Sequence, residues 1–377
     1  MKLRDICKKL EDWAPLAYQE SYDNSGLIVG DPETDVKGVL VSLDCLECVV
    51  DEAISKDCNV VVSHHPIVFA GLKSLTGKNY VERTVLKAIK NNIALYAIHT
   101  NLDNIGTGVN KMIADRLSLQ NVKILEPKKG GLKMLITYVP NSHIDLVRTA
   151  LFAQGAGSIG EYSECHFSVD GIGTFKGSDN SNPAVGQKGI RESVSEQRIE
   201  LVFPSYLESK VVSTLKTIHP YEEVAYSVLT LNNKNENVGY GMIGEIPEPL
   251  NEMEFLKKIK IKLKTDCIRY TSLLNSKIKK VAICGGAGRF LSHWTDDSRG
   301  GGRVRCPGQR ARHHRLAGAS ALLRASEPPR TEPWTRAPRL VHSPHCTTEG
   351  NGGCNRHILS ARGAIQLWTG VSAIAVL

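Results

Sequence analysis

Three histidines and one aspartate have the types and spacing that could hold a metal ion. The pair His64-His65 ends an apolar run, and His99 and Asp103 follow His65 by 34 and 38 residues. His99 also ends an apolar run. Neutral imidazole and carboxylate are ligands of zinc, iron and manganese in hydrolytic centres. The sequence therefore indicates a site for a divalent metal ion.

Buried β-strands are the elements that must position these side chains. Segments 59–63 and 93–98 are short and apolar, which is typical of buried strands, and polar residues stop each of them. Helical patterns at 46–56 and 80–91 alternate with the strands, which favours βαβ units and a parallel sheet. In such a sheet the carboxyl ends of the strands form one edge, where sites develop. We therefore expect the imidazoles and the carboxylate to converge there.

A purely structural role remains open for each residue. Neighbouring strand residues point to opposite faces, so His64 and His65 can share an ion only if the chain turns, which Pro66 favours. Without that turn the pair is a polar strand end. His99 could instead cap a turn, and Asp103 could form an N-cap or an Asx-turn.

Composition indicates an ordinary globular protein. The chain has 377 residues, of which 41% are hydrophobic and 23% are charged, and such a chain can contain two or more domains. No apolar stretch approaches the roughly 20 residues of a membrane span, and the N-terminus lacks the apolar core of a signal peptide. We expect a cytoplasmic protein with no membrane partner.

The net charge of +8 is unevenly distributed. Residues 292–377 contain 12 Arg, no Lys and 5 acidic residues, which gives +7, whereas 1–291 contain 35 basic and 34 acidic residues, which gives +1. Because the body is nearly neutral, the charge gives little support to a nucleic-acid partner.

Four segments differ in their patterns. Residues 1–124 alternate helix and strand and form the metal-site half of an α/β core. Residues 125–237 have a β-α-β…β-α-β order, which predicts an inserted ferredoxin-like domain. The α/β pattern returns at 238–291, and 292–377 is rich in Arg and Pro.

The tail 292–377 has two interpretations, a disordered basic segment or a non-native one caused by a reading-frame error. We favour the frame error because residues 1–291 use 27 Lys and 8 Arg, whereas the tail uses Arg alone. Sequencing of the encoding DNA tests this interpretation.

The chain resembles the dinuclear-metal-centre hexamer family, the Nif-three-like proteins that in bacteria are called GTP cyclohydrolase I type 2 homologues. The motifs that carry the resemblance are 21–27 (SYDNSGL), 63–69 (SHHPIVF), 99–103 (HTNLD) and 285–288 (GGAG), with 157–162 (GSIGEY), 173–177 (GTFKG) and 219–223 (HPYEE) in the insert. The resemblance covers about 1–291. It implies an α/β Nif-three-like core with a mainly parallel sheet, and a ferredoxin-like (PII-like) α+β insert.

The resemblance implies two divalent metal ions, such as Zn, Fe or Mn, and a metal-bound water as the nucleophile, with no catalytic side chain assigned. Its metal ligands correspond to His64, His65 and Asp103, the last as a bridging carboxylate. His99 and Asp44 are candidates for further ligands or for groups that orient a ligand. The candidate residues next to a substrate are Asp23, Asn24, Ser25, Gly26, Gly285, Gly286 and Gly288.

The other half of the family's site is a C-terminal His followed four residues later by a Glu. His345 and Glu349 have that spacing, but their Pro/Arg-rich surroundings suggest a chance match. We therefore expect this chain to be inactive or weakly metallated.

Three functions follow as hypotheses. The first is a metal-dependent hydrolase of the GTP cyclohydrolase type, which opens the imidazole ring of GTP and releases formate. The second is a non-catalytic metal-binding assembly or regulatory protein, and the third is a nucleotide phosphoesterase. The resemblance also implies a homohexamer, and it makes a small nucleotide the candidate substrate.

Overall fold

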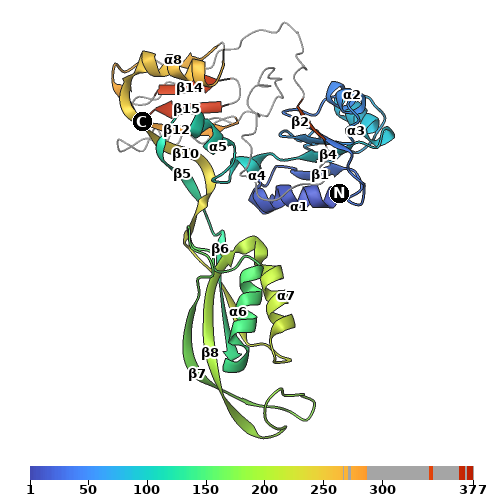
Figure 1. Cartoon of the computed structure of the whole chain (residues 1–377), viewed down its shortest axis with the longest axis vertical. Coiled ribbons are helices and arrows are strands. Elements are labelled where there is room, and N and C mark those ends of the chain that lie inside the picture. Colours follow the sequence, from blue (N-terminus) through green and yellow to red (C-terminus); the bar gives the residue numbers. More distant parts are fainter. Residues whose placement is uncertain (266, 271–272, 287–338, 343–364, 370–371, 377) are drawn as a thin grey trace. The chain divides into compact units, whose positions relative to one another are not determined.

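A computed structural model of the chain describes residues 1–286 except 266 and 271–272, together with 339–342, 365–369 and 372–376 (Figure 1). The chain divides into two compact units. One comprises Met1–Glu126 and Val238–Leu377, and the other comprises Pro127–Asn237. The architecture is mixed α/β, with three sheets of five, six and four strands among the described residues.

The first sheet positions the candidate site. Its strands are β1 (Gly26–Val29), β2 (Gly38–Ser42), β3 (Val60–Ser63), β4 (Ala94–Ala97) and β13 (Arg339–His342), in the order β1-β4-β3-β2-β13. Strands β13, β2, β3 and β4 are parallel, and β1 is antiparallel to β4.

Helices cover both faces of this sheet, which explains the continuous apolar runs of its strands. Alternate residues of β3 show the division. Val61 packs in the cluster that contains Val50 of α2 (Glu47–Ser55) and Ala88 of α3 (Tyr80–Lys90). Val62 packs in the cluster that contains Leu3 of α1 (Leu3–Trp13).

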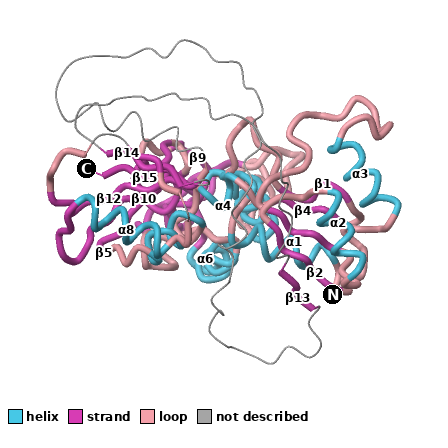
Figure 2. Tube along the Cα trace, turned by 90° about the horizontal axis from the view of Figure 1, so that it is seen from above, coloured by secondary structure: helices cyan, strands magenta, loops and turns pink. Residues whose placement is uncertain are grey.

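Short helices follow β4 at the edge where the site lies. Helix α4 (Thr100–Asp103) begins directly after His99, and α5 (Val109–Arg116) comes next. The 3₁₀ helix η1 (Leu16–Tyr18) precedes the segment that carries Asp23. Figure 2, coloured by secondary structure, labels α4 and the strands β1, β2, β4 and β13 of this sheet.

The second sheet of the same unit is mostly built from residues late in the sequence. Its order is β11-β14-β15-β12-β10-β5. The strands are β5 (Gln120–Lys129), β10 (Lys234–Asn251), β11 (Arg269–Tyr270), β12 (Lys277–Gly285), β14 (Ile365–Thr369) and β15 (Ser372–Val376). Helices α5 and α8 (Glu252–Lys262) pack on β10 and β12 through one core cluster. The pairings from β10 to β11 are antiparallel, so the expected parallel pairing is found in the first sheet and not in these strands.

The second unit is inserted between β5 and β10 in the chain. Its elements are β6 (Leu132–Pro140), η2 (Asn141–His143), α6 (Ile144–Ala153), β7 (Phe167–Lys176), β8 (Arg191–Pro204), η3 (Ser205–Leu207), α7 (Glu208–Ile218) and β9 (Tyr226–Thr230). The sheet order is β7-β8-β6-β9, and every neighbouring pair is antiparallel. Helices α6 and α7 lie side by side (Figure 1) and share one core with alternate residues of β6 and β8.

Parts of the sequence-based prediction concern residues outside this description. Gly288, His345, Glu349 and most of 292–377 lie outside the described residues. The short strands β13, β14 and β15 lie in the tail, for which the sequence analysis named no element. No helix in the described part of the chain is both long enough and apolar enough to cross a membrane.

Candidate metal centre

The candidate site begins where the neighbouring parallel strands β3 and β4 end. Ser63 of β3 lies opposite Ala97 of β4, so the residues that follow both strands reach the same edge of the sheet. The chain bends at His64 and His65, and the Ser63 hydroxyl donates a hydrogen bond to the His65 carbonyl at 2.9 Å. This bend is the turn that two adjacent histidines need if both are to face one site.

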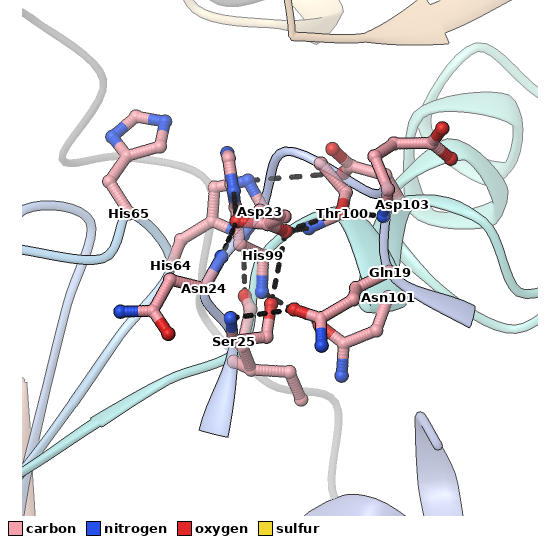
Figure 3. A network of polar contacts seen from close by, with 12 residues as sticks. Gln19, Asp23, Asn24, Ser25, His64, His65, His99, Thr100, Asn101 and Asp103 are labelled. Atoms are coloured by element: carbon pink, nitrogen blue, oxygen red, sulfur yellow. Dashed lines mark hydrogen bonds and ion pairs between the residues drawn. The ribbon is translucent and has the colours of Figure 1, made fainter. Parts of the chain in front are cut away.

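Three imidazole rings meet at this edge (Figure 3). The ring centroids of His64 and His65 are 5.0 Å apart, those of His64 and His99 are 5.2 Å apart, and those of His65 and His99 are 5.5 Å apart. One nitrogen from each ring lies within 4.8 Å of the other two. The three histidines therefore form a cluster that could hold a metal ion.

Each ring is fixed through its Nδ1 atom. Nδ1 of His64 lies 2.9 Å from the carbonyl oxygen of Ile98. Nδ1 of His65 lies 2.8 Å from Asp44 Oδ1, and Nδ1 of His99 lies 2.7 Å from Asp23 Oδ1. Because each partner is an acceptor, each Nδ1 carries the proton and each Nε2 keeps a lone pair for a cation. Asp44 thus orients His65, which is one of the two roles that the sequence left open for it.

Asp103 brings a carboxylate to the same place. Its Oδ1 atom is buried without a hydrogen-bond partner in the described structure and lies 3.9 Å from His64 Nε2. That distance is too long for a hydrogen bond. A buried polar atom without a partner costs about 1–3 kcal/mol, and a cation would remove that cost. This oxygen and the three imidazoles together suit a divalent metal ion.

Burial sets the protonation of the two innermost groups. Burial, together with the neighbouring His65 and His99, lowers the pKa of His64 to about 3, so its ring is neutral at pH 7. Burial also raises the pKa of Asp103 to about 6, and the nearby His99 and His65 oppose that rise. A neutral imidazole is the form that binds metal ions, and a cation would favour the ionised form of Asp103.

Asp23 is held behind His99 by five hydrogen bonds. Its Oδ1 accepts from the Asn24 backbone N–H and from His99 Nδ1. Its Oδ2 accepts from the Thr100 N–H and hydroxyl and from the Ser25 hydroxyl. Burial would raise the pKa of Asp23, but the hydrogen bonds with His99 and Thr100 outweigh it and lower that pKa well below its usual range. The side chain is fully buried and is ionised at neutral pH, so its carboxylate fixes the ring of His99.

The other residues expected near a substrate are engaged with the protein to different degrees. The Asn24 side chain donates to the Val68 carbonyl at 2.7 Å, and the Ser25 N–H donates to Gln19 Oε1. Gly26 belongs to β1 and pairs with Ala97, with a φ of +114°. These contacts build the wall of the site from the segment before β1.

The glycine turn after β12 reaches the same region. A Cβ atom on Gly285 would lie 3.4 Å from Asp103 Oδ1, whereas one on Gly286 would have no atom of the described residues within 4 Å. Asn110, which the sequence did not single out, connects this turn to Asp103 with its buried side chain. Thr100 was also missed, although it lies inside the recognised 99–103 motif, because its role depends on Asp23, 77 residues away.

Comparison with known proteins places these features in a family context. The sequence model of the family Duf34/NIF3 (NGG1p interacting factor 3) matches residues 1–297. The chain is 39% identical over 291 residues to the "GTP cyclohydrolase 1 type 2 homolog" of Bacillus subtilis, covering 77% of this chain and 78% of that protein. The solved structure of a Bacillus cereus protein related to NIF3 is 39% identical, with a TM-score of 0.66 and coverage of 76% and 77%. A Staphylococcus aureus protein is 31% identical, with a TM-score of 0.59 and coverage of 78% of each chain.

Proposed function

Because the chain belongs to the Duf34/NIF3 family, we propose that it is a divalent-metal hydrolase that acts on a nucleotide, with GTP as the first candidate. The observation that carries this proposal is the convergence of one nitrogen from each of three imidazoles, together with a buried carboxylate oxygen of Asp103 that has no hydrogen-bond partner in the described structure.

A divalent cation would supply Lewis-acid polarisation of a substrate oxygen and a lower pKa for water. The chain's own residues would hold that cation through His64, His65, His99 and Asp103. The acceptors behind the rings hold the proton of a neutral imidazole on Nδ1, and loss of such a partner commonly lowers metal affinity 10- to 100-fold. Burial of His64 and Asp103 keeps bulk water from competing for the ligand atoms.

A flat apolar side chain next to the cluster supports a nucleotide as substrate. The ring of Phe69 stands edge-on to His99, with centroids 5.6 Å apart, and 46% of Phe69 is exposed. An exposed aromatic ring can stack on a purine base. We propose that the backbone N–H of Gly286, which follows Gly285 beside Asp103, contacts a phosphate of that substrate.

We also infer that the insert is a ferredoxin-like domain, which its β-α-β-β-α-β order and its sheet order β7-β8-β6-β9 support.

We propose that the chain forms a homohexamer in the cytoplasm, as its resemblance to the family suggests. Light scattering on the purified chain measures the number of subunits. We expect fewer than two metal ions per chain. The family's C-terminal His and Glu ligands have no counterpart within residues 1–297, where the family match lies.

The test combines elemental analysis with product analysis on the full chain. We expect bound Zn, Fe or Mn, and release of formate from GTP at a rate reduced by the missing ligand pair. The variants His64→Ala and His99→Ala should lose metal and turnover together. His143→Ala, which changes a histidine of the insert that contacts Ser142, is the matched control and should keep both.

The products separate the alternatives. Phosphate release without formate would replace the cyclohydrolase with a phosphoesterase. Metal binding without turnover of any nucleotide would indicate a binding or regulatory protein. Equal metal content in the wild type and in His64→Ala would refute the proposed site itself.

A further inference from the structure

We propose that Asn110 is a positioning residue that holds Asp103 in place for metal binding. The inference rests on the proposed function, because it concerns the metal site described above. It adds a residue that acts through the main chain of Asp103 and of Gly285.

The side-chain amide of Asn110 makes two hydrogen bonds to the main chain. Its Nδ2 donates to the carbonyl oxygen of Asp103 at 2.8 Å, and its Oδ1 accepts from the Gly285 N–H at 2.7 Å. The residue is only 2% exposed. Asn110 therefore ties the end of α4 to the end of β12, although these positions are 182 residues apart in the sequence.

Asp103 needs such support because the helix that carries it is very short. Helix α4 has four residues, and a single turn gains too little from its own hydrogen bonds to be stable alone. Its buried carboxylate oxygen has no hydrogen-bond partner in the described structure that could fix its direction. The position of this oxygen therefore depends on how firmly the backbone of Asp103 is held.

The bond to Gly285 links the same amide to the glycine turn. Gly285 lies against the carboxylate, since a Cβ atom there would be 3.4 Å from Asp103 Oδ1 and 3.6 Å from Asn110 Oδ1. A shift of either segment would thus change the space around the carboxylate. By bonding both segments, one side chain sets the distance between them.

Asn59 provides a matched control within the chain. Its Nδ2 donates to the Asp35 carbonyl at 2.9 Å and its Oδ1 accepts from the Lys37 N–H at 2.8 Å. It thus makes the same pair of bonds to the main chain, at the start of β3 and not at the ligand-bearing end. A general loss of stability in either variant would appear in its unfolding temperature, whereas a loss of positioning would weaken metal binding only in Asn110→Ala.

The experiment measures the affinity of the metal-free chain for Mn²⁺ and Co²⁺ by titration calorimetry, with the visible Co²⁺ absorption spectrum and the thermal unfolding temperature of the metal-free chain. We expect Asn110→Ala to bind about tenfold more weakly, the lower end of the effect for losing a supporting hydrogen bond, and to change the Co²⁺ spectrum. Asn59→Ala should bind within about twofold of the wild type, whatever its unfolding temperature.

A second variant keeps the test decisive if Asn110→Ala does not fold. Asn110→Asp retains the acceptor for the Gly285 N–H but, when ionised, cannot donate to the Asp103 carbonyl, so it should also weaken binding. The positioning role would be overturned if folded Asn110 variants keep the affinity and the Co²⁺ spectrum of the wild type. If Asp103→Asn loses binding in the same experiment, the proposed metal site itself still stands. Failure of the wild type to bind either ion would overturn both proposals.

Discussion

Replacement of Asp23 by asparagine should destabilise the chain severely, and the hydrogen-bond pattern sets the size of the effect. Oδ1 of Asp23 accepts from the Asn24 N–H and from His99 Nδ1, and Oδ2 accepts from Thr100 and Ser25. An asparagine offers one oxygen and one NH₂ group. In either orientation its NH₂ group faces a rigid backbone N–H, that of Asn24 or that of Thr100.

The magnitude follows from these contacts. One buried donor without a partner costs about 1–3 kcal/mol, and each remaining bond loses roughly 1 kcal/mol when its acceptor is no longer charged. We therefore expect Asp23→Asn to lower the free energy of unfolding by about 3 kcal/mol or more. If the NH₂ group faces His99, that ring must place its proton on Nε2 to accept the new bond, which removes the lone pair available for a metal ion.

Urea unfolding followed by circular dichroism measures the stability, and calorimetric titration with Mn²⁺ measures the affinity, which should fall 10- to 100-fold. Asp31→Asn is the control for the change of charge, because Asp31 is exposed and accepts one backbone hydrogen bond, from Glu33. A loss below about 1 kcal/mol in Asp23→Asn, or a loss no larger than in the control, would refute this account of the buried carboxylate.

Two further predictions concern stability away from the site. Burial would raise the pKa of Glu82, but hydrogen bonds from Thr76 and Lys78 lower it to about 2. The ionised side chain therefore stabilises the fold fully above about pH 4.5. This contribution is lost as the pH falls from about 4.5 to 2. Glu82→Gln should therefore be less stable than the wild type at pH 7, with a difference that shrinks in urea unfolding as the pH falls through that window, and a constant difference would contradict the pKa assignment. Gly30 has a φ of +129°, and a Cβ atom there would lie 2.7 Å from Ala94 Cβ, so Gly30→Ala should lower the free energy of unfolding by about 2 kcal/mol or more. Thermal unfolding compares this variant with Gly130→Ala, where φ is also positive but a Cβ atom would have no described neighbour within 4 Å. Equal losses in the two variants would exclude the steric explanation.

The hydrophobic pattern of the sequence, with the polar residues that stop each apolar run, was sufficient to predict the elements that carry the histidines. The apolar runs 59–63 and 93–98 correspond to β3 and β4, and the helical pattern at 80–91 corresponds to α3. These segments are buried on both faces or bury one helical face, so their hydrophobic pattern reports their packing directly.

Other elements were missed because their sequences are polar. Strand β7 lies in the Gly/Ser/Asn-rich stretch 155–189, where Gly171 and Gly173 weaken any strand pattern. It forms because it pairs along its whole length with β8, and long-range pairing of this kind leaves little trace in local sequence. Most of β10 is similarly polar and was not predicted.

The site shows the same limit at the level of single residues. His64, His65, His99 and Asp103 were chosen by residue type and spacing, and the structure brings them together. The contacts that support these side chains join segments that are far apart in the sequence. Asp44 and His65 are 21 residues apart, and Asn110 and Gly285 are 175 residues apart. Spacing along the chain contains no information on such contacts, and the family resemblance supplied the segment 23–26 and the glycine turn as candidates without these contacts.

The neighbouring positions of β5 and β10 in their sheet have a consequence for how this protein could have acquired its second unit. Segment 127–237 leaves and re-enters the core through adjacent strands, so its two junctions are close in space. A tight hairpin could bridge the same gap. The unit would then be a removable module, and its gain or loss would leave the candidate metal-binding edge unchanged. Swapping it for a short Asn-Gly turn would create a minimal scaffold for engineering.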